Sequence, residues 1–308
     1  MNKIWRLFLC VALVIIIIVA IAALVGFAVN YKKSDNGDKE NTIEKFNNYV
    51  NVLDNLNYKQ PKHKFNIPMY YINLEKSKDR NNKIINQKKK YDLSLQRVDG
   101  IYGNSLESNQ SGEIFLTPSK KVKFINKFLE NDDENTKPVL GCLLSHIKAI
   151  FTAFENNDNI AMILEDDISL ITYNHWSYKL DKIIKKAPLD WRIINLYHFC
   201  KKEKNIKFIL NNEETCGSTV CYIINKKGID EIINSVFKEN TIIIEKNDMH
   251  NKIPSDYYIY NLVKTYHYNG KVMLFPDLTL QSTIHSDHFQ FQLNNTIEKI
   301  QKFLKLIN

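Results

Sequence analysis

The sequence predicts an α/β fold in which a mostly parallel sheet is flanked by helices. From Phe65 onward, short apolar runs alternate with segments of helical periodicity, which is the pattern of strands connected by helices. The run IAMIL, residues 160–164, is apolar on both faces, as expected for a central parallel strand. With 308 residues and 44% apolar content, the chain can bury a core of ordinary size.

Two strands and two helices are predicted in the first half of the domain. Strands are expected over 67–74 (IPMYYINL) and 95–100 (LQRVDG), and the segment 79–90 between them is expected to be a helix with a charged outer face. A second helix is expected over 141–154, with its apolar residues on one face. Those residues are Leu143, Ile147, Ile150 and Phe154.

The second half continues the alternation. Further strands are expected over 160–164, 191–197, 219–225 and 271–275. Helical spacing predicts helices over 226–237, 256–266 and 297–308. The last of these is expected to pack on the domain, with a role at a membrane surface as the alternative.

The N-terminal part predicts a membrane anchor. Leu7–Val29 carries no charge, and at about 1.5 Å per residue it is long enough to cross a bilayer. A signal peptide is the alternative, but its apolar region usually has only about 7–15 residues.

We therefore expect a cytoplasmic tail and anchor over 1–30, a polar stem over 31–64 and the main domain over 65–308. Within the stem, residues 42–56 have helical spacing. Basic residues flank both ends of the anchor, so the expected type II orientation rests on the bulk of the chain following it. The domain would then lie in the secretory lumen or on the extracytoplasmic side.

Composition argues against two classes of site. The net charge of +8 could indicate nucleic-acid binding, but the lysines are scattered and no compact basic-aromatic module occurs. An excess of lysine also suits an anionic substrate or a membrane surface. The five cysteines include no CxxC pair, which argues against a zinc site. Cys216 and Cys221 are close enough to pair, with free buried thiols as the alternative.

Three adjacent acids follow the strand expected over 160–164. Ligands of open α/β sheets bind beyond the carboxyl ends of the strands, which is where these acids lie. In an extended chain Glu165 and Asp167 point to one side and Asp166 to the other. Two carboxylates on one side suit Mg²⁺ or Mn²⁺, and such an ion can hold a diphosphate and stabilise its charge as it leaves. The alternative is an acidic turn that caps the next element.

Six stretches in a fixed order resemble glycosyltransferase family 25. They are YYINLEKSKDR (70–80), VDG (98–100), GCLLSHIKA (141–149), MILEDD (162–167), GSTVCYIINKKGIDEII (217–233) and PSDYYIY (254–260). The family includes bacterial lipooligosaccharide galactosyltransferases and collagen hydroxylysine galactosyltransferases. The resemblance covers residues 65–288 and implies a GT-A-type, Rossmann-like domain, a nucleotide-sugar donor and transfer with inversion.

The resemblance also implies a metal site. Glu165, Asp166 and Asp167 match the DxD-type metal and donor motif, with Glu in the first position as the family pattern allows. Asp167 and Glu165 are the expected metal ligands, and Glu165 and Asp166 are expected to contact the donor. His285 is expected to complete the metal shell after the last strand, with His288 as the second choice.

Other matched positions are expected to contact the donor. They are Asn73, Arg80, Asp99, Gly100, Ser145 and His146. Four of these have an ordinary structural alternative: a helical ion pair for Arg80, a simple turn for Asp99 and Gly100, and a satisfied core group for His146.

Inversion requires a base that deprotonates the acceptor hydroxyl as it attacks the anomeric carbon. Asp256, after Pro254 and Ser255, stands at a predicted helix start and matches the second acidic motif of the family. It is the expected base or acceptor contact. The alternative is a favourable interaction of this charge with the helix N-terminus.

The leading hypothesis is a membrane-anchored, metal-dependent glycosyltransferase that moves a hexose, galactose or glucose, from a UDP-sugar. The expected acceptor is a glycan or a hydroxylated protein side chain, the expected cofactor is Mn²⁺ or Mg²⁺, and no nucleic-acid partner is expected. A non-catalytic relative that binds glycans or a partner protein is the main alternative, against which the intact acids argue. A metal-dependent nucleotidyltransferase or phosphoesterase would share the carboxylates.

Overall fold

The computed structural model of the chain describes residues 42–53, 67–128, 136–173, 180–198, 206–211, 217–245, 253–269, 275–276 and 289–307. The anchor expected over 7–29 lies outside the described residues, as do Cys216, His285 and His288. Residues 42–53, in the predicted stem, form a helix. The chain divides into two compact units, 1–49 and 50–308, and the fold described below belongs to the second.

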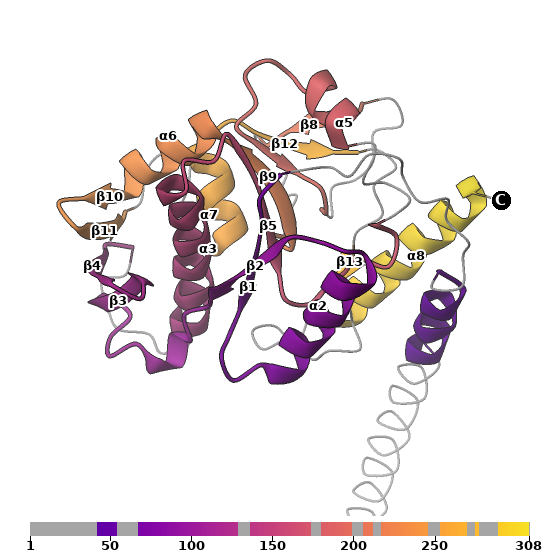
Figure 1. Cartoon of the computed structure of the whole chain (residues 1–308), viewed down its shortest axis with the longest axis horizontal. Helices are drawn as coiled ribbons and strands as arrows, with labels where there is room; N and C mark the ends of the chain where they lie inside the picture. Colours follow the sequence, from indigo (N-terminus) through magenta and orange to yellow (C-terminus); the bar gives the residue numbers. More distant parts are fainter. Residues whose placement is uncertain are drawn as a thin grey trace, which may run out of the picture. The chain divides into compact units, whose positions relative to one another are not determined.

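A seven-stranded sheet forms the centre of this unit, in the order β2-β1-β5-β9-β7-β12-β8 (Figure 1). Its strands are β1 (Met69–Asn73), β2 (Leu95–Asp99), β5 (Ile160–Glu165), β7 (Ile193–Asn195), β8 (Phe208–Leu210), β9 (Cys221–Asn225) and β12 (Thr265–Tyr268). The strands β2, β1, β5, β7 and β12 run one way, and β9 and β8 run the other. The predicted α/β fold with a mostly parallel sheet is confirmed.

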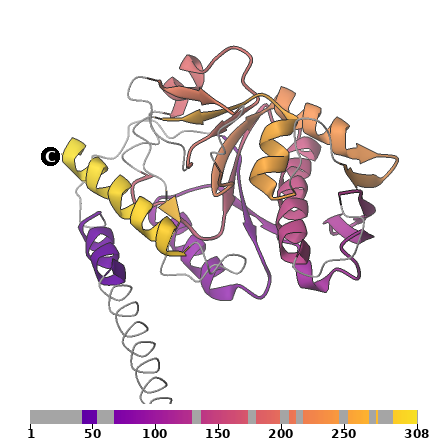
Figure 2. The same ribbon diagram turned by 180° about the vertical axis from the view of Figure 1, so that it is seen from behind.

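Helices lie on both faces of the sheet. They are α2 (Lys78–Lys90), α3 (Lys137–Glu155), α5 (Leu180–Lys186), α6 (Lys226–Val236), α7 (Ser255–Leu262) and α8 (Phe289–Ile307). The helices α3, α6 and α7 cover one face, and α2 and α8 lie on the other side, as the view from behind in Figure 2 also shows.

The helix α3 is the central helix of the core. Its predicted apolar residues Leu143, Ile147 and Ile150 are buried, but so are Leu144 and Phe151 on other faces. The helix is buried almost all round because it packs against the sheet, α6 and α7. Among the described residues it is the one helix long and apolar enough to cross a membrane, but 61% of its most apolar window is buried inside the domain.

A second, four-stranded sheet has the order β10-β11-β4-β3 and was not predicted. Its strands are β3 (Ser111–Thr117), β4 (Lys120–Asn126), β10 (Phe237–Lys238) and β11 (Thr241–Ile244). In β4, Val122 and Phe124 are buried while Lys121 and Lys123 are exposed, which is the two-residue period of a half-buried strand. A short pair, β6 (Ile168–Ser169) with β13 (Phe275–Pro276), follows the acid triplet.

The predicted helix over 256–266 was wrong in its second half. The helix α7 ends at Leu262, and β12 follows and pairs in parallel with β7. Thr265 and its aromatic neighbours favour an extended strand, and the sheet supplies hydrogen-bond partners that a longer helix would forgo. The C-terminal helix, predicted from 297, begins earlier, at Phe289.

Candidate functional site

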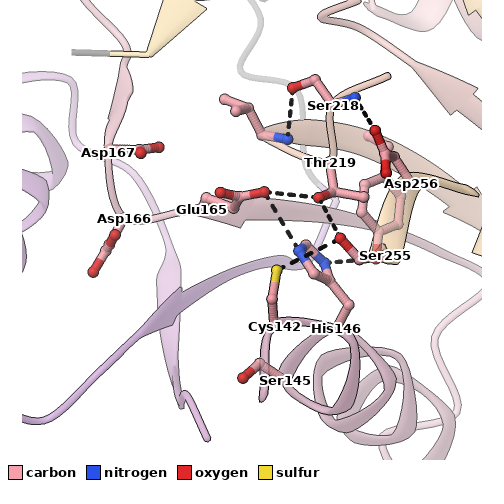
Figure 3. A network of polar contacts seen from close by, with 12 residues as sticks. Cys142, Ser145, His146, Glu165, Asp166, Asp167, Ser218, Thr219, Ser255 and Asp256 are labelled. Carbon is pink, nitrogen blue, oxygen red and sulfur yellow. Dashed lines mark hydrogen bonds and ion pairs between the residues drawn. The ribbon is translucent and has the colours of Figure 1, made fainter. Parts of the chain in front are cut away.

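The acid triplet lies at the carboxyl end of β5, beside the end of β1. Glu165 is the last residue of β5, and Asp166 and Asp167 form the turn that follows. Figure 3 shows the Asp166 carboxylate directed to the opposite side of the chain from that of Asp167, although the two residues lie in the turn and not in the strand. The three acids therefore have different surroundings.

Asp166 is bound by two groups from other elements. Asn73, at the end of β1, donates from Nδ2 to Oδ2 of Asp166 at 2.6 Å, and Arg80 of α2 donates from Nη1 to Oδ1 at 2.9 Å. Burial raises the pKa of Asp166, although Arg80 and Asn73 lower it. The amide of Asn73 also accepts from Nε of Arg97 at 3.0 Å. Asp166 thus ties β1, α2 and β5 together.

Glu165 is held on one oxygen. Its Oε1 accepts from Oγ1 of Thr219 at 2.8 Å and lies 3.5 Å from Nε2 of His146 (Figure 3). Burial raises the pKa of Glu165, but His146, Thr219 and Arg80 together outweigh it and leave the pKa below its usual value. Glu165 is therefore an ionised carboxylate at neutral pH.

Asp167 is the least compensated of the three acids. Its Oδ2 lies 3.6 Å from Nη1 of Arg80, while its buried Oδ1 has no hydrogen-bond partner among the described residues. Burial and the charge of Glu165 raise the pKa of Asp167 to about 7. Arg80 therefore supplies part of the positive charge that the triplet requires, and the negative charge of Asp167 is only partly compensated.

The residues described do not by themselves complete a metal site. In these ranges no group of three or more His, Cys, Asp or Glu side chains is arranged to hold a metal ion. His285, expected to complete the shell, lies outside them.

Ser145 and His146 lie in the buried part of α3. Oγ of Ser145 donates to the carbonyl of Gly141 at 2.6 Å and accepts from the backbone N–H of Ile101 at 2.7 Å, so it fixes the loop after β2 against the helix. Nδ1 of His146 lies 3.3 Å from the hydroxyl of Tyr222. His146 is thus both buried and in contact with the acid triplet.

A cavity of about 140 Å³ opens beside the triplet. Five of the predicted residues line it: Arg80, Ser145, His146, Glu165 and Asp166. A second cavity of about 570 Å³ adjoins it, and both are lined by Leu74, Lys76, Ile101 and Tyr102. Nζ of Lys76 lies 3.4 Å from the centre of the Tyr102 ring, and a hydrogen bond to Lys76 lowers the pKa of the Tyr102 hydroxyl.

Lys76 and Tyr102 were not among the residues predicted for the site. Lys76 falls inside the stretch 70–80 that matches the family, but its position between two cavities depends on the loop after β2. Asp99 is not among the residues that line either cavity; it is exposed and pairs with Arg97 at 2.9 Å. Gly100 lines the second cavity, and its N–H donates to the carbonyl of Asn73 at 2.9 Å.

Asp256 lies in the first turn of α7, on the β9 side of the triplet. Its Oδ2 accepts from the N–H of Ser218 at 2.9 Å, and its Oδ1 accepts from the N–H of Tyr257 at 3.0 Å. A Cβ at Gly217 would lie 2.6 Å from Oδ2, so the chain before β9 packs directly on this carboxylate. Figure 3 shows Asp256 beside the polar network that leads to Glu165.

The chain matches known proteins over this same region. The model of glycosyltransferase family 25, described as an LPS biosynthesis protein family, matches residues 66–259. Procollagen galactosyltransferase 2 of Mus musculus is 23% identical over 176 residues, which make up 54% of this chain and 27% of that protein. Procollagen galactosyltransferase 1-A of Xenopus laevis is 24% identical over 178 residues, or 54% and 28% of the two chains.

A glycosyltransferase 25 family member of Aedes aegypti is 23% identical over 212 residues, which cover 64% of this chain and 33% of that protein. The matches thus span about a quarter to a third of these relatives. Among solved structures, A197 from STIV matches with a TM-score of 0.32 and 10% identity, covering 66% of this chain and 81% of the other. Such a score is too low to carry an inference about this fold.

The family match covers more than half of the chain and includes the site from Asn73, at the end of β1, to Asp256, at the start of α7. This chain belongs to glycosyltransferase family 25.

Proposed function

We propose that this chain is a hexosyltransferase with a GT-A-type fold. It moves galactose or glucose from a UDP-sugar to a glycan or to a hydroxylated protein side chain, with inversion at the anomeric carbon. Membership of family 25 and the similarity to two procollagen galactosyltransferases support this activity. The observation that carries it is the acid triplet at the carboxyl end of β5, beside a cavity that is also lined by Arg80 and Lys76.

The order of the strands favours one orientation of the bound UDP-sugar across the sheet edge. The strand β5, which ends in the acids, lies between β1 and β9. Asp256 contacts the chain just before β9, whereas the two cavities lie at the ends of β1 and β2. We therefore place the sugar towards Asp256 and the nucleoside towards β2. Lys76, between the cavities, is suited to the diphosphate because an ammonium forms charge-assisted hydrogen bonds with phosphate oxygens.

One feature of the site, the carboxylate of Asp167, suits a divalent cation. The buried Oδ1 of Asp167 lacks a protein partner in the described part of the chain, and the raised pKa of this carboxyl indicates uncompensated negative charge. Asp167 and Glu165, with the predicted His285, would hold Mn²⁺ or Mg²⁺, which would stabilise the charge of the leaving diphosphate.

Asp256 is the proposed base. Its carboxylate holds two backbone N–H donors, one on each oxygen, so a lone pair remains on each for an acceptor hydroxyl. The hydroxyl would lose its proton to Asp256 as its oxygen attacks the anomeric carbon from the face opposite the diphosphate.

The alternatives explain less. A non-catalytic relative gives no reason for the buried Asp167, whose pKa is raised to about 7, next to two acids, Glu165 and Asp166, that line a cavity. Such perturbed acids are typical of functional sites. A phosphoesterase would use the same carboxylates, but it gives no reason for the match to family 25 over 66–259.

The anchor remains part of the proposal. The uncharged stretch 7–29 supports a single membrane span with the domain on the lumenal or extracytoplasmic side.

The test is UDP release by the full-length chain in detergent, with Mn²⁺ and a panel of UDP-sugars. We expect one hexose donor to be consumed, and Asp256→Asn to slow release by about 100-fold or more. Asp181→Asn, an exposed acid of α5 paired with Lys185, is the matched control and should behave as wild type. A chain that neither binds nor consumes any donor would contradict the proposal, and phosphate release without sugar transfer would favour the phosphoesterase.

A further inference from the structure

Two consecutive residues just before β9 each form a hydrogen bond with one acid of the proposed site. One of these acids is Asp256, the proposed base, and the other is Glu165, at the donor side of the site. The N–H of Ser218 donates to Oδ2 of Asp256 at 2.9 Å, and Oγ1 of Thr219 donates to Oε1 of Glu165 at 2.8 Å (Figure 3). The backbone continues this contact, since the N–H of Glu165 donates to the carbonyl of Val220 at 3.0 Å. One short segment therefore sets where both carboxylates lie.

The hydrogen bonds around Thr219 have a fixed direction. Thr219 donates to Glu165, so the single hydroxyl proton of Thr219 is used in that bond. In the 3.0 Å contact between Thr219 and Ser255, the hydroxyl of Ser255 must therefore be the donor. Because the Ser255 proton is used in that contact, the thiol of Cys142, whose Sγ lies 3.5 Å from the Ser255 hydroxyl oxygen, is the donor to it. All three bonds point towards Glu165.

The backbone of Ser218 is held in an uncommon conformation. Its φ is 101°, a region that residues other than glycine rarely adopt. Its carbonyl accepts from Nδ2 of Asn195 at 3.1 Å and from the hydroxyl of Tyr260 at 2.9 Å. With the bond from its N–H to Asp256, three contacts fix the two peptide groups on either side of the Ser218 Cα, as expected where strain is retained at a functional site.

We propose that Thr219 is a positioning residue of the transfer reaction. Its hydroxyl, together with His146, occupies Oε1 of Glu165 and so leaves Oε2 to face the donor in the adjoining cavity. The bond between Ser218 and Asp256 then sets the separation of the donor and the base. This inference rests on the proposed function, because it needs Glu165 to act on the donor, directly or through the cation that it would hold.

The test uses Thr219→Val, which keeps the side-chain volume but removes the hydroxyl, and Thr219→Ser, which keeps the hydroxyl. UDP release from UDP-galactose and UDP-glucose is measured with the full-length chain in detergent and Mn²⁺. The free energy of a hydrogen bond to a charged group corresponds to a ratio of about tenfold or more, and this ratio sets the scale of the change in donor affinity expected when Glu165 is no longer held in place. We therefore expect Thr219→Val to raise the donor KM by about tenfold with a smaller change in kcat, and Thr219→Ser to restore KM to within about twofold.

Thermal unfolding checks that both variants fold, and Thr219→Ala replaces Thr219→Val if the latter does not. A donor KM for the variant without the hydroxyl that equals the wild-type value would overturn the inference. So would equal losses in the valine and serine variants, which would indicate a packing role. If the wild-type chain releases no UDP from either sugar and binds no UDP in a calorimetric titration, the proposed function fails, and this inference fails with it.

Discussion

Nη1 of Arg80 lies 2.9 Å from Oδ1 of Asp166, and both side chains are largely buried. The same guanidinium lies 3.6 Å from Oδ2 of Asp167, so a single arginine from α2 serves two of the three acids. Burial opposes the charged form of Arg80, but Asp167 and Asp166 outweigh this and raise its pKa. Arg80 therefore offsets part of the electrostatic repulsion among the three acids, before any ligand binds.

Replacing Arg80 should therefore destabilise the fold. Arg80→Met leaves buried carboxylates without their partner, and breaking such a pair from one side typically costs about 3–5 kcal/mol. Arg80→Lys should lose less, because it keeps the charge but not the planar donor set. The measurement is urea denaturation of the full-length chain without divalent cations.

Arg192→Met is the matched control for this experiment. Arg192 also pairs with an acid, Glu231, at 2.6 Å, but that carboxylate is exposed. Exposed pairs contribute about 1 kcal/mol or less, so the control should lose much less stability. Similar losses at both arginines would show that the acid triplet does not depend on Arg80.

Asp167→Asn tests whether the uncompensated acid binds a cation. The substitution removes repulsion with Glu165, so without metal the variant should be at least as stable as wild type. Adding Mn²⁺ should raise the melting temperature of wild type, because a ligand that binds the folded state stabilises it, and should leave the variant unchanged. Asp181→Asn should keep the wild-type response. An identical response to Mn²⁺ in Asp167→Asn would place the ion elsewhere.

The two sheet strands at the site, β1 and β5, could be predicted from the sequence because each is a continuous apolar run that ends at polar residues. The strands β3 and β4 were not predicted, although the alternation of Lys121, Val122, Lys123 and Phe124 carried that signal. The strand β12 was mistaken for helix because its residues follow α7 without a glycine or proline to mark the boundary.

Side-chain partners were harder to predict than strands. The three acids were found from their place after β5, but their neutralisation by Arg80 depends on how α2 packs against that turn. Thr219 and Tyr102 escaped notice because nothing in their own segments marks them as polar contacts of a carboxylate or of Lys76. Such contacts form between segments that are distant in the sequence, so the pattern of residues within one segment does not predict them.

Gly141 allows the loop after β2 to reach α3. A Cβ on Gly141 would lie 2.6 Å from the backbone N of Gly103 and 2.7 Å from the carbonyl O of Ile101, which line the first cavity. Gly141→Ala should therefore lower the free energy of unfolding by about 1–3 kcal/mol through overpacking. It should also raise the donor KM, because it displaces the loop that lines the first cavity. Unfolding in urea and donor kinetics measure the two effects.

Gly228→Ala is the matched control for Gly141→Ala. A Cβ on Gly228 would lie 2.8 Å from the carbonyl O of Arg192, so it is also overpacked, but Gly228 lines neither cavity. It should lower stability without changing the donor KM. A raised KM in both variants would mean that loss of stability, and not the displaced wall, weakens donor binding.

His267 should make the fold sensitive to acid. Its Nε2 donates to Oδ1 of Asn211 at 3.1 Å, and its Nδ1 accepts from Nδ2 of Asn195 at 3.2 Å. The ring is therefore neutral, and a second proton on Nδ1 would point at the N–H donor of Asn195. Burial lowers the pKa of His267 to about 4, from 6.5 for a free histidine. Between these values the unfolded chain takes up a proton that the folded chain does not, so the free energy of unfolding falls as the pH falls.

The expected loss from this residue is on the order of 3 kcal/mol between about pH 6.5 and about pH 4, with no contribution above that range. His267→Gln cannot take up a proton here. The difference in stability between wild type and the variant, measured by urea denaturation from about pH 7.5 to about pH 4.5, should therefore shrink as the pH falls. A difference that stays constant over this range would show that His267 has the same pKa in the folded and unfolded chains.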